Sequence, residues 1–117
     1  MTIVCYPKCS TCKKAVAWLS QRGIEPVYRD IQKENPTVEE LKKWRRESGL
    51  PLKRFFNTSG QIYRREKLAE RLPGMSEEEQ YERLAKDGLL VKRPILLLDD
   101  GVLVGFKEKE WAEKIGT

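Results

Sequence analysis

Two cysteines, Cys9 and Cys12, stand three residues apart in the segment YPKCSTCKKA at positions 6–15. This spacing occurs in half of a metal site, in a disulfide and in a working thiol pair. A structural zinc site needs four ligands, whereas this chain offers three cysteines and no histidine. We therefore expect no metal here. The pair is interpreted either as a redox-active dithiol or as two inert small residues at the start of a helix.

The helical phase distinguishes the two thiols. Apolar residues recur at i, i+3, i+4 and i+7, namely Cys12, Ala15, Val16 and Leu19. This pattern predicts a helix from about Ser10 whose apolar face shields Cys12. Cys9 precedes the first turn and is expected to be exposed, where free amide groups stabilise a thiolate. Cys9 would then attack a substrate, and Cys12 would resolve the product as a Cys9–Cys12 disulfide.

The same loop has the chemistry of an oxyanion site. Lys8 and Lys13 flank the predicted helix start, and Ser10 and Thr11 add hydroxyl groups. Helix N-termini with unpaired amides bind phosphate-sized anions. The alternative interpretation of the two hydroxyl residues is that they only cap the helix.

The elements around the loop begin with a βαβ unit. Residues 2–6 (TIVCY) form a short β-branched run typical of a buried strand, and residues 25–31 (EPVYRDI) read as a second strand. The helix between them is expected to end at Gly23. A strand, helix and strand within this length predict two parallel strands with a right-handed crossover.

The middle of the chain reads as helical. A capping box at Thr37 begins a helix that Gly49 ends, and a second box at Ser76 begins a helix expected to end at Gly88. Residues 50–74 between them are less regular and predict short helices. Residues 94–98 (PILLL) and 102–105 (VLVG) then form a hairpin around the turn signal DDG, and a last helix starts near position 107.

This order predicts an α/β, thioredoxin-like, four-stranded mixed sheet. Residues 1–117 would form a single domain with a helical insert at about 36–90. In such a sheet Arg93 and Pro94, at the start of the third strand, lie beside the cysteine loop. Pro94 is expected to be cis, because thioredoxin-like proteins place a cis proline there. Arg93 is a candidate partner for an anion or a thiol, a solvated surface charge being the alternative.

The composition limits which kinds of partner we expect. The net charge is +5, from 23 basic and 18 acidic residues. This excess favours anionic partners, but the charges are mixed along the chain and form no basic groove, so we expect no direct nucleic-acid binding. We see no leader and no long apolar run, and the cysteine number is odd, so we expect a cytoplasmic protein without membrane contact.

Four segments together resemble the arsenate-reductase-like family, which includes the Spx-type redox regulators. They are YPKCSTCKKA, FFNTSG, KRPILL and VGFKE, in this order along the chain. The likeness is greatest to small CxxC-bearing members. It implies a redox thiol at Cys9, no metal or nucleotide cofactor, and electrons from glutathione–glutaredoxin or thioredoxin. The alternative it implies is a regulator that binds RNA polymerase with the disulfide as a switch.

The resemblance also implies where the oxyanion would be bound. Enzymes of the family surround it with several arginines, and Arg93 matches one of them. The positions of two others fall at Asn57 and around residues 105–107, where this chain has no arginine. The sequence therefore predicts weak binding of arsenate, and a small oxyanion or a thiol or disulfide compound as substrate.

Overall fold

A mixed sheet is the centre of the computed structural model, which describes residues 1–116. Within these residues four strands pair in the order β2-β1-β3-β4. The strand β1 (Thr2–Cys5) runs parallel to β2 (Val27–Asp30) and antiparallel to β3 (Ile95–Leu98). The hairpin partner of β3 is β4 (Gly101–Val104). The predicted fold class and topology are confirmed.

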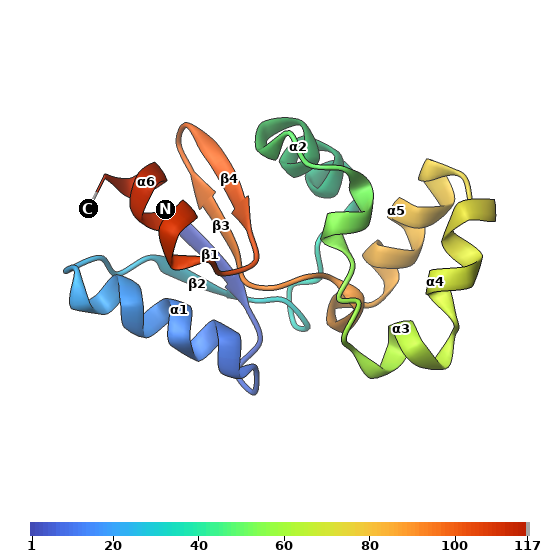
Figure 1. Ribbon diagram of the computed structural model, residues 1–117, viewed down its shortest axis with the longest axis horizontal. Helices are drawn as coiled ribbons and strands as arrows, with labels where there is room; N and C mark the ends of the chain where they lie inside the picture. The colour runs from blue at the N-terminus through green and yellow to red at the C-terminus, as the bar shows by residue number, and fades with distance from the viewer. Residues whose placement is uncertain (117) are drawn as a thin grey trace.

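Two helices cover one face of this sheet, α1 (Ser10–Gln21) and α6 (Glu108–Ile115) (Figure 1). Because side chains alternate along a strand, Ile3, Cys5 and Leu96 point toward these helices, into a core cluster shared with Cys12 and Trp111. Three aromatic rings meet edge to face between α1 and α6: Trp18, Phe106 and Trp111. This packing fixes α1, and with it the cysteine loop, against the sheet.

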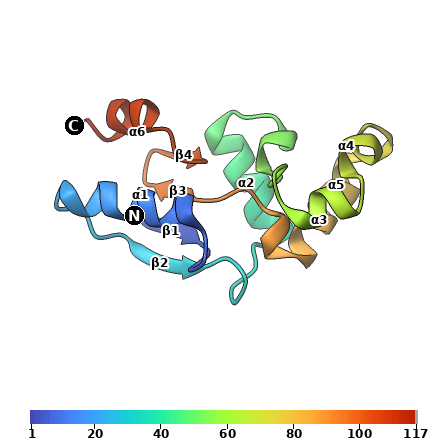
Figure 2. The same ribbon diagram turned by 60° about the horizontal axis from the view of Figure 1, so that its bottom comes forward.

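The helical segment between β2 and β3 lies on the other side and extends the molecule to 43 × 27 × 24 Å (Figures 1 and 2). Its elements are α2 (Val38–Ser48), η1 (Leu52–Phe55), α3 (Gln61–Arg65), α4 (Leu68–Arg71), η2 (Leu72–Gly74), α5 (Glu77–Lys86) and η3 (Gly88–Leu90). A second core cluster joins Val4 and Ile95 of the sheet to Leu41 and Trp44 of α2. Hydrophobic burial therefore attaches the helical segment to the sheet.

The element ends follow the predicted signals with some shifts. Both capping boxes form, at Thr37 with Glu40 and at Ser76 with Glu79. The prediction that α5 ends at Gly88 was wrong by two residues, because the Asp87 side chain accepts a hydrogen bond from the Leu89 amide (3.2 Å) and starts η3. The second strand also proves shorter than residues 25–31.

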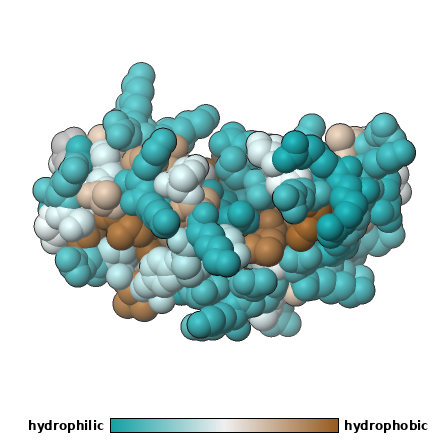
Figure 3. Space-filling view, turned by 90° about the horizontal axis from the view of Figure 1, so that it is seen from below, coloured by the Kyte–Doolittle hydropathy of each residue, from teal (hydrophilic) through white to brown (hydrophobic). Residues whose placement is uncertain are grey.

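The surface is largely hydrophilic. Seen from below, hydrophilic residues dominate the helical end, and hydrophobic ones are confined to separate patches (Figure 3). Among residues 1–116 no helix combines the length and the apolar character needed to cross a bilayer. Charged side chains of both signs also pair between elements, as Arg45 does with Glu77 and Arg83 with Glu66.

Candidate dithiol and anion-binding site

Cys9 is the N-cap residue of α1. Its sulfur accepts a hydrogen bond from the Cys12 amide at 3.4 Å, and its carbonyl accepts one from the Lys13 amide at 3.1 Å. One amide of the first turn therefore donates to the sulfur at the positive end of the helix dipole, an arrangement that favours a negative charge there. Cys9 was expected to be exposed but is only half-exposed, because it packs against the core cluster beneath α1.

Cys12 is shielded, as the helical phase predicted, with 2% of its surface exposed. A hydrogen bond from the Cys5 side chain, helped by the Tyr6 backbone and Cys9, lowers the pKa of Cys12 to about 6 although burial opposes this shift. The same hydrogen bond, together with burial, raises the pKa of Cys5 well above its usual range. All three thiols are free, so no disulfide joins them in this state.

Cys9 lines a cavity of about 420 Å³. Cations from three separate segments line it: Arg54 in η1, Lys92 and Arg93 before β3, and Lys107 after β4. Asn57, Ser59 and Thr11 add polar groups, and none of the described residues lining the cavity is acidic. The cavity therefore has the charge and polarity suited to an anion.

Backbone hydrogen bonds hold the cationic walls together. The Asn57 amide donates to the Leu90 carbonyl (2.7 Å), and the Lys92 amide donates to the Phe55 carbonyl (2.8 Å). These bonds, with the bridge between Phe56 and Val91, place the η1 segment alongside the residues before β3. The residues that carry Arg54 and those that carry Lys92 and Arg93 are thereby fixed side by side.

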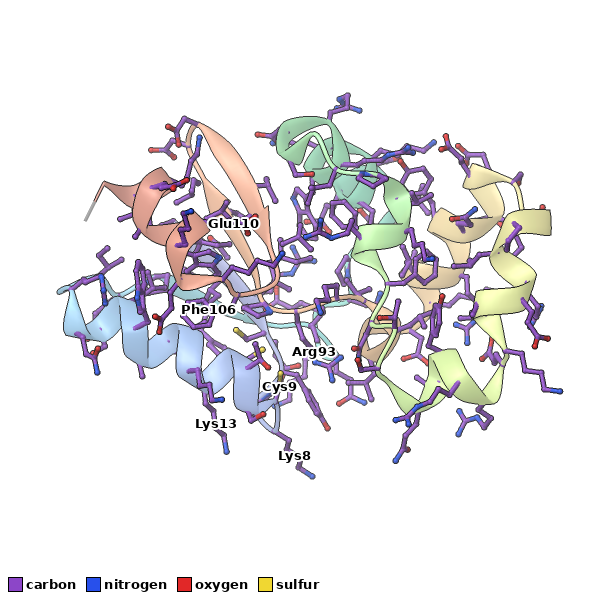
Figure 4. All side chains as sticks on the ribbon, in the orientation of Figure 1. Lys8, Cys9, Lys13, Arg93, Phe106 and Glu110 are labelled. Atoms are coloured by element: carbon purple, nitrogen blue, oxygen red, sulfur yellow. The ribbon has the colours of Figure 1, made fainter. Side chains whose placement is uncertain are left out.

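Arg93 points toward Cys9 (Figure 4). The Arg93–Pro94 peptide bond is cis, as the fold led us to expect. The guanidinium lies 5.3 Å from the centre of the Tyr6 ring, and Nη1 donates to the Leu89 carbonyl at 3.0 Å. Its Nε is buried and has no hydrogen-bond partner within residues 1–116. Arg93 is thus held in the cavity wall by defined contacts, and one of its donors is left unused.

The other predicted anion contacts are distributed differently. Thr11 lines the cavity, whereas Lys8, Ser10 and Lys13 do not, and both lysines point away from it (Figure 4). Their roles in binding an anion remain predictions.

Sequence reasoning missed the other cations of the cavity. Lys92 was detectable as the neighbour of Arg93, but Arg54 and Lys107 reach the site through tertiary packing, and no sequence signal marked them.

The structure combines a thioredoxin-like sheet, a dithiol at the start of its first helix and a cis proline at the start of β3. The chain belongs to the ArsC family, whose sequence model matches residues 5–114. It is 50% identical to YusI of Bacillus subtilis over 97% of this chain and 96% of that protein.

Two solved structures resemble it along almost their whole length. The structure of an ArsC-family-related protein from Bacteroides fragilis has 54% identity and a TM-score of 0.92, covering 96% of this chain and 94% of that one. That of a possible arsenate reductase from Streptococcus mutans has 39% identity and a TM-score of 0.84, covering 94% and 95%. A more distant relative is the global transcriptional regulator Spx of Staphylococcus epidermidis, 28% identical over 94% of this chain and 82% of the regulator.

Proposed function

We propose that this protein is a thiol-dependent reductase that uses Cys9 as nucleophile and Cys12 as resolving thiol, acting on a small anionic substrate. The observation that carries the proposal is the position of Cys9, whose sulfur accepts a hydrogen bond from the Cys12 amide and which lines a cavity with four cationic residues. Family membership and the likeness to a possible arsenate reductase support the same class of reaction.

With a disulfide substrate, the Cys9 thiolate attacks one sulfur and the other leaves as a thiolate that takes up a proton. The Cys12 thiolate then attacks the Cys9 sulfur. The second substrate sulfur leaves, and a Cys9–Cys12 disulfide remains. Two electrons have passed from the dithiol to the substrate. An external thiol donor, glutaredoxin with glutathione or thioredoxin, returns them without a metal or nucleotide cofactor in this chain.

With arsenate, the Cys9 sulfur would replace one oxygen, which leaves as water after protonation. Attack of Cys12 on the Cys9 sulfur would then leave the bonding electron pair on arsenic, reducing As(V) to As(III). The sequence argument for weak arsenate binding rested on two missing arginines. Arg54, and Lys107 at the edge of the second of these positions, line the cavity and supply cations there, so arsenate remains one of the proposed substrates. A chain that works through free thiols belongs in a reducing compartment, and we place it in the cytoplasm.

The proposal is tested by turnover with arsenate and with glutathione disulfide, supplied in turn with glutaredoxin and with thioredoxin systems. We expect reductant consumption by the parent chain and background rates for Cys9→Ser. In Cys12→Ser, a Cys9 adduct with the substrate should accumulate and be visible by mass spectrometry. Turnover that persists in Cys9→Ser, or its absence from the parent with every pair, would refute the proposal.

The second candidate is a redox-switched regulator that docks on RNA polymerase. The identity with Spx over 94% of the chain favours it, and the same dithiol would serve as the switch. Retention of the chain by purified RNA polymerase, dependent on the state of the dithiol and without any turnover, would favour this candidate over the reductase.

A further inference from the structure

A second cavity adjoins the cavity beside Cys9. It has a volume of about 310 Å³, and its polar lining consists of Lys53, Arg54, Thr58 and Lys92. Arg54 and Lys92 also line the cavity beside Cys9. The two cavities are therefore neighbours that share two cations, and Cys9 lines only the first of them.

The cations of the second cavity are not paired with acids. None of the described residues lining it is acidic. Among residues 1–116, no ion pair involves Lys53, Arg54 or Lys92. Basic residues in other parts of the chain do have such partners, as Arg29 has Glu40. Like charges gathered in one place repel one another, so a bound anion would stabilise this arrangement.

The backbone brings these cations together before any ligand binds. The Lys92 amide donates to the Phe55 carbonyl at 2.8 Å, and Phe56 pairs with Val91, so Lys92 is fixed beside η1. At the first cavity Lys92 passes close to Gly105, where a Cβ would lie 3.3 Å from Lys92 Cε. An anion would thus meet a preformed site, which lowers the cost of binding.

Apolar residues complete the second cavity. Pro51 and Phe56 line it together with the cations, and Phe56 is held in the core with 1% of its surface exposed. An inorganic oxyanion gains nothing from apolar contact, whereas the carbon skeleton of an organic anion does. The lining of the second cavity therefore suits an organic anion.

We propose that the ligand of this site is an organic molecule with two anionic groups, one in the cavity beside Cys9 and the other held in the second cavity by Lys53, Arg54 and Lys92. The inference rests on the proposed function and deepens it. The preferred substrate is an organic disulfide of this kind, because an arsenate ion would occupy only the first cavity. The reaction at Cys9 is the disulfide exchange described above, and the cations of the second cavity bind the substrate without exchanging electrons.

The test measures how ligands protect Cys9 from alkylation by iodoacetamide, followed by mass spectrometry. Two matched pairs of unreactive probes are compared. S-methylglutathione has a carboxylate at each end and S-methylcysteine has one, whereas fructose bisphosphate has a phosphate at each end and inorganic phosphate is a single anion. We expect the two-ended probe of at least one pair to protect Cys9 at a lower concentration than its one-ended counterpart.

Lys53 is the residue to change, because it lines the second cavity but not the first. In Lys53→Met we expect roughly fivefold weaker protection by a two-ended probe, the loss of one partly solvated charge contact. Protection by the one-ended probes should be unchanged. Lys86→Met is the matched control, since Lys86 is exposed on α5 and lines neither cavity. It should behave like the parent with every probe.

A Lys53→Met effect confined to one pair would identify the second anionic group as a carboxylate or as a phosphate. The inference would be overturned if Lys53→Met left both two-ended probes unaffected, weakened inorganic phosphate equally, or was matched by Lys86→Met. No turnover is measured, so the two proposals can fail separately. A chain that binds the two-ended probes through Lys53 but reduces no disulfide would refute the reductase and leave the second binding site in place.

Discussion

The Arg93 guanidinium lies between the Tyr6 ring and the Leu89 carbonyl, with a buried Nε that has no partner among residues 1–116. An anion beside Cys9 would give this side chain a charged acceptor. Such hydrogen bonds contribute about 1.5–3 kcal/mol. Arg93→Met keeps much of the length of the side chain but removes the charge, so we expect sulfate or arsenate to bind roughly tenfold more weakly or worse.

Anion binding can be followed as protection of Cys9 from alkylation in sulfate titrations. Arg65→Met is the matched control, because Arg65 is exposed on α3 and does not line the cavity. It should titrate like the parent. If Arg93→Met also bound sulfate as tightly as the parent, the sulfate site would lie elsewhere. Arg93 would then be an ordinary solvated surface charge.

The three thiols show how far the sequence alone predicts the site. The spacing of Cys12 with Ala15 and Leu19 gives a helical phase, and that local pattern predicted its burial correctly. Cys5 lies in the run 2–6 that was predicted to be a buried strand, and it is buried. That it shares a core cluster with Cys12 depends on how α1 packs across β1, which spacing along the chain does not encode.

At the scale of elements, Gly88 has a packing role that differs from the helix-ending role predicted from the sequence. A glycine after a helix suggests a stop signal, but α5 ends before it. Instead, a Cβ on residue 88 would lie 2.1 Å from the Ile31 carbonyl oxygen, which is backbone of the segment after β2. Glycine is required there because two chain segments pass each other closely. No pattern in the sequence reports which backbone approaches a glycine.

We therefore expect Gly88→Ala to lower the free energy of unfolding by about 2 kcal/mol or more, as overpacking against backbone does. Urea denaturation measures this directly. Gly74→Ala is the control, because a Cβ at residue 74 would meet nothing within 4 Å. Its effect should be small in comparison. Equal stability of Gly88→Ala and the parent would mean that η3 shifts away from Ile31 at little cost.

On the scale of the whole molecule, the anion cavity is assembled from segments far apart in the sequence. Arg54, Arg93 and Lys107 meet only because the helical segment docks beside the strands of the hairpin. The order of strands and helices was readable from periodicity and turn signals, which are local. The docking depends on contacts between distant residues, so the cavity and most of its cations could not be predicted.

An ion pair fastens this helical segment to the sheet. Arg29 on β2 makes two hydrogen bonds to Glu40 on α2, Nη1 to Oε2 at 2.6 Å and Nη2 to Oε1 at 2.9 Å. Arg29 Nε also donates to the Glu34 carbonyl at 3.0 Å. Such a planar, two-point contact is the geometry in which an Arg–carboxylate pair contributes most. The hydrogen bonds from Arg29 lower the pKa of Glu40 below its ordinary value of 4.5.

Glu40→Gln removes the charge but leaves a residue that still completes the capping box with Thr37. We expect it to lower the free energy of unfolding at neutral pH by about 1 kcal/mol, since the pair is partly solvated. Because the pKa of Glu40 is lower in the folded chain, its contribution is fully present above 4.5 and is lost as the pH falls through the folded value. Urea denaturation over a pH series should thus show the variant and the parent converging in acid.

Glu78→Gln is the control variant. It removes the exposed partner of Lys42 and should differ little from the parent in stability at any pH. A gap between Glu40→Gln and the parent that stayed constant into acid would show that the carboxylate charge does not hold the two parts of the molecule together.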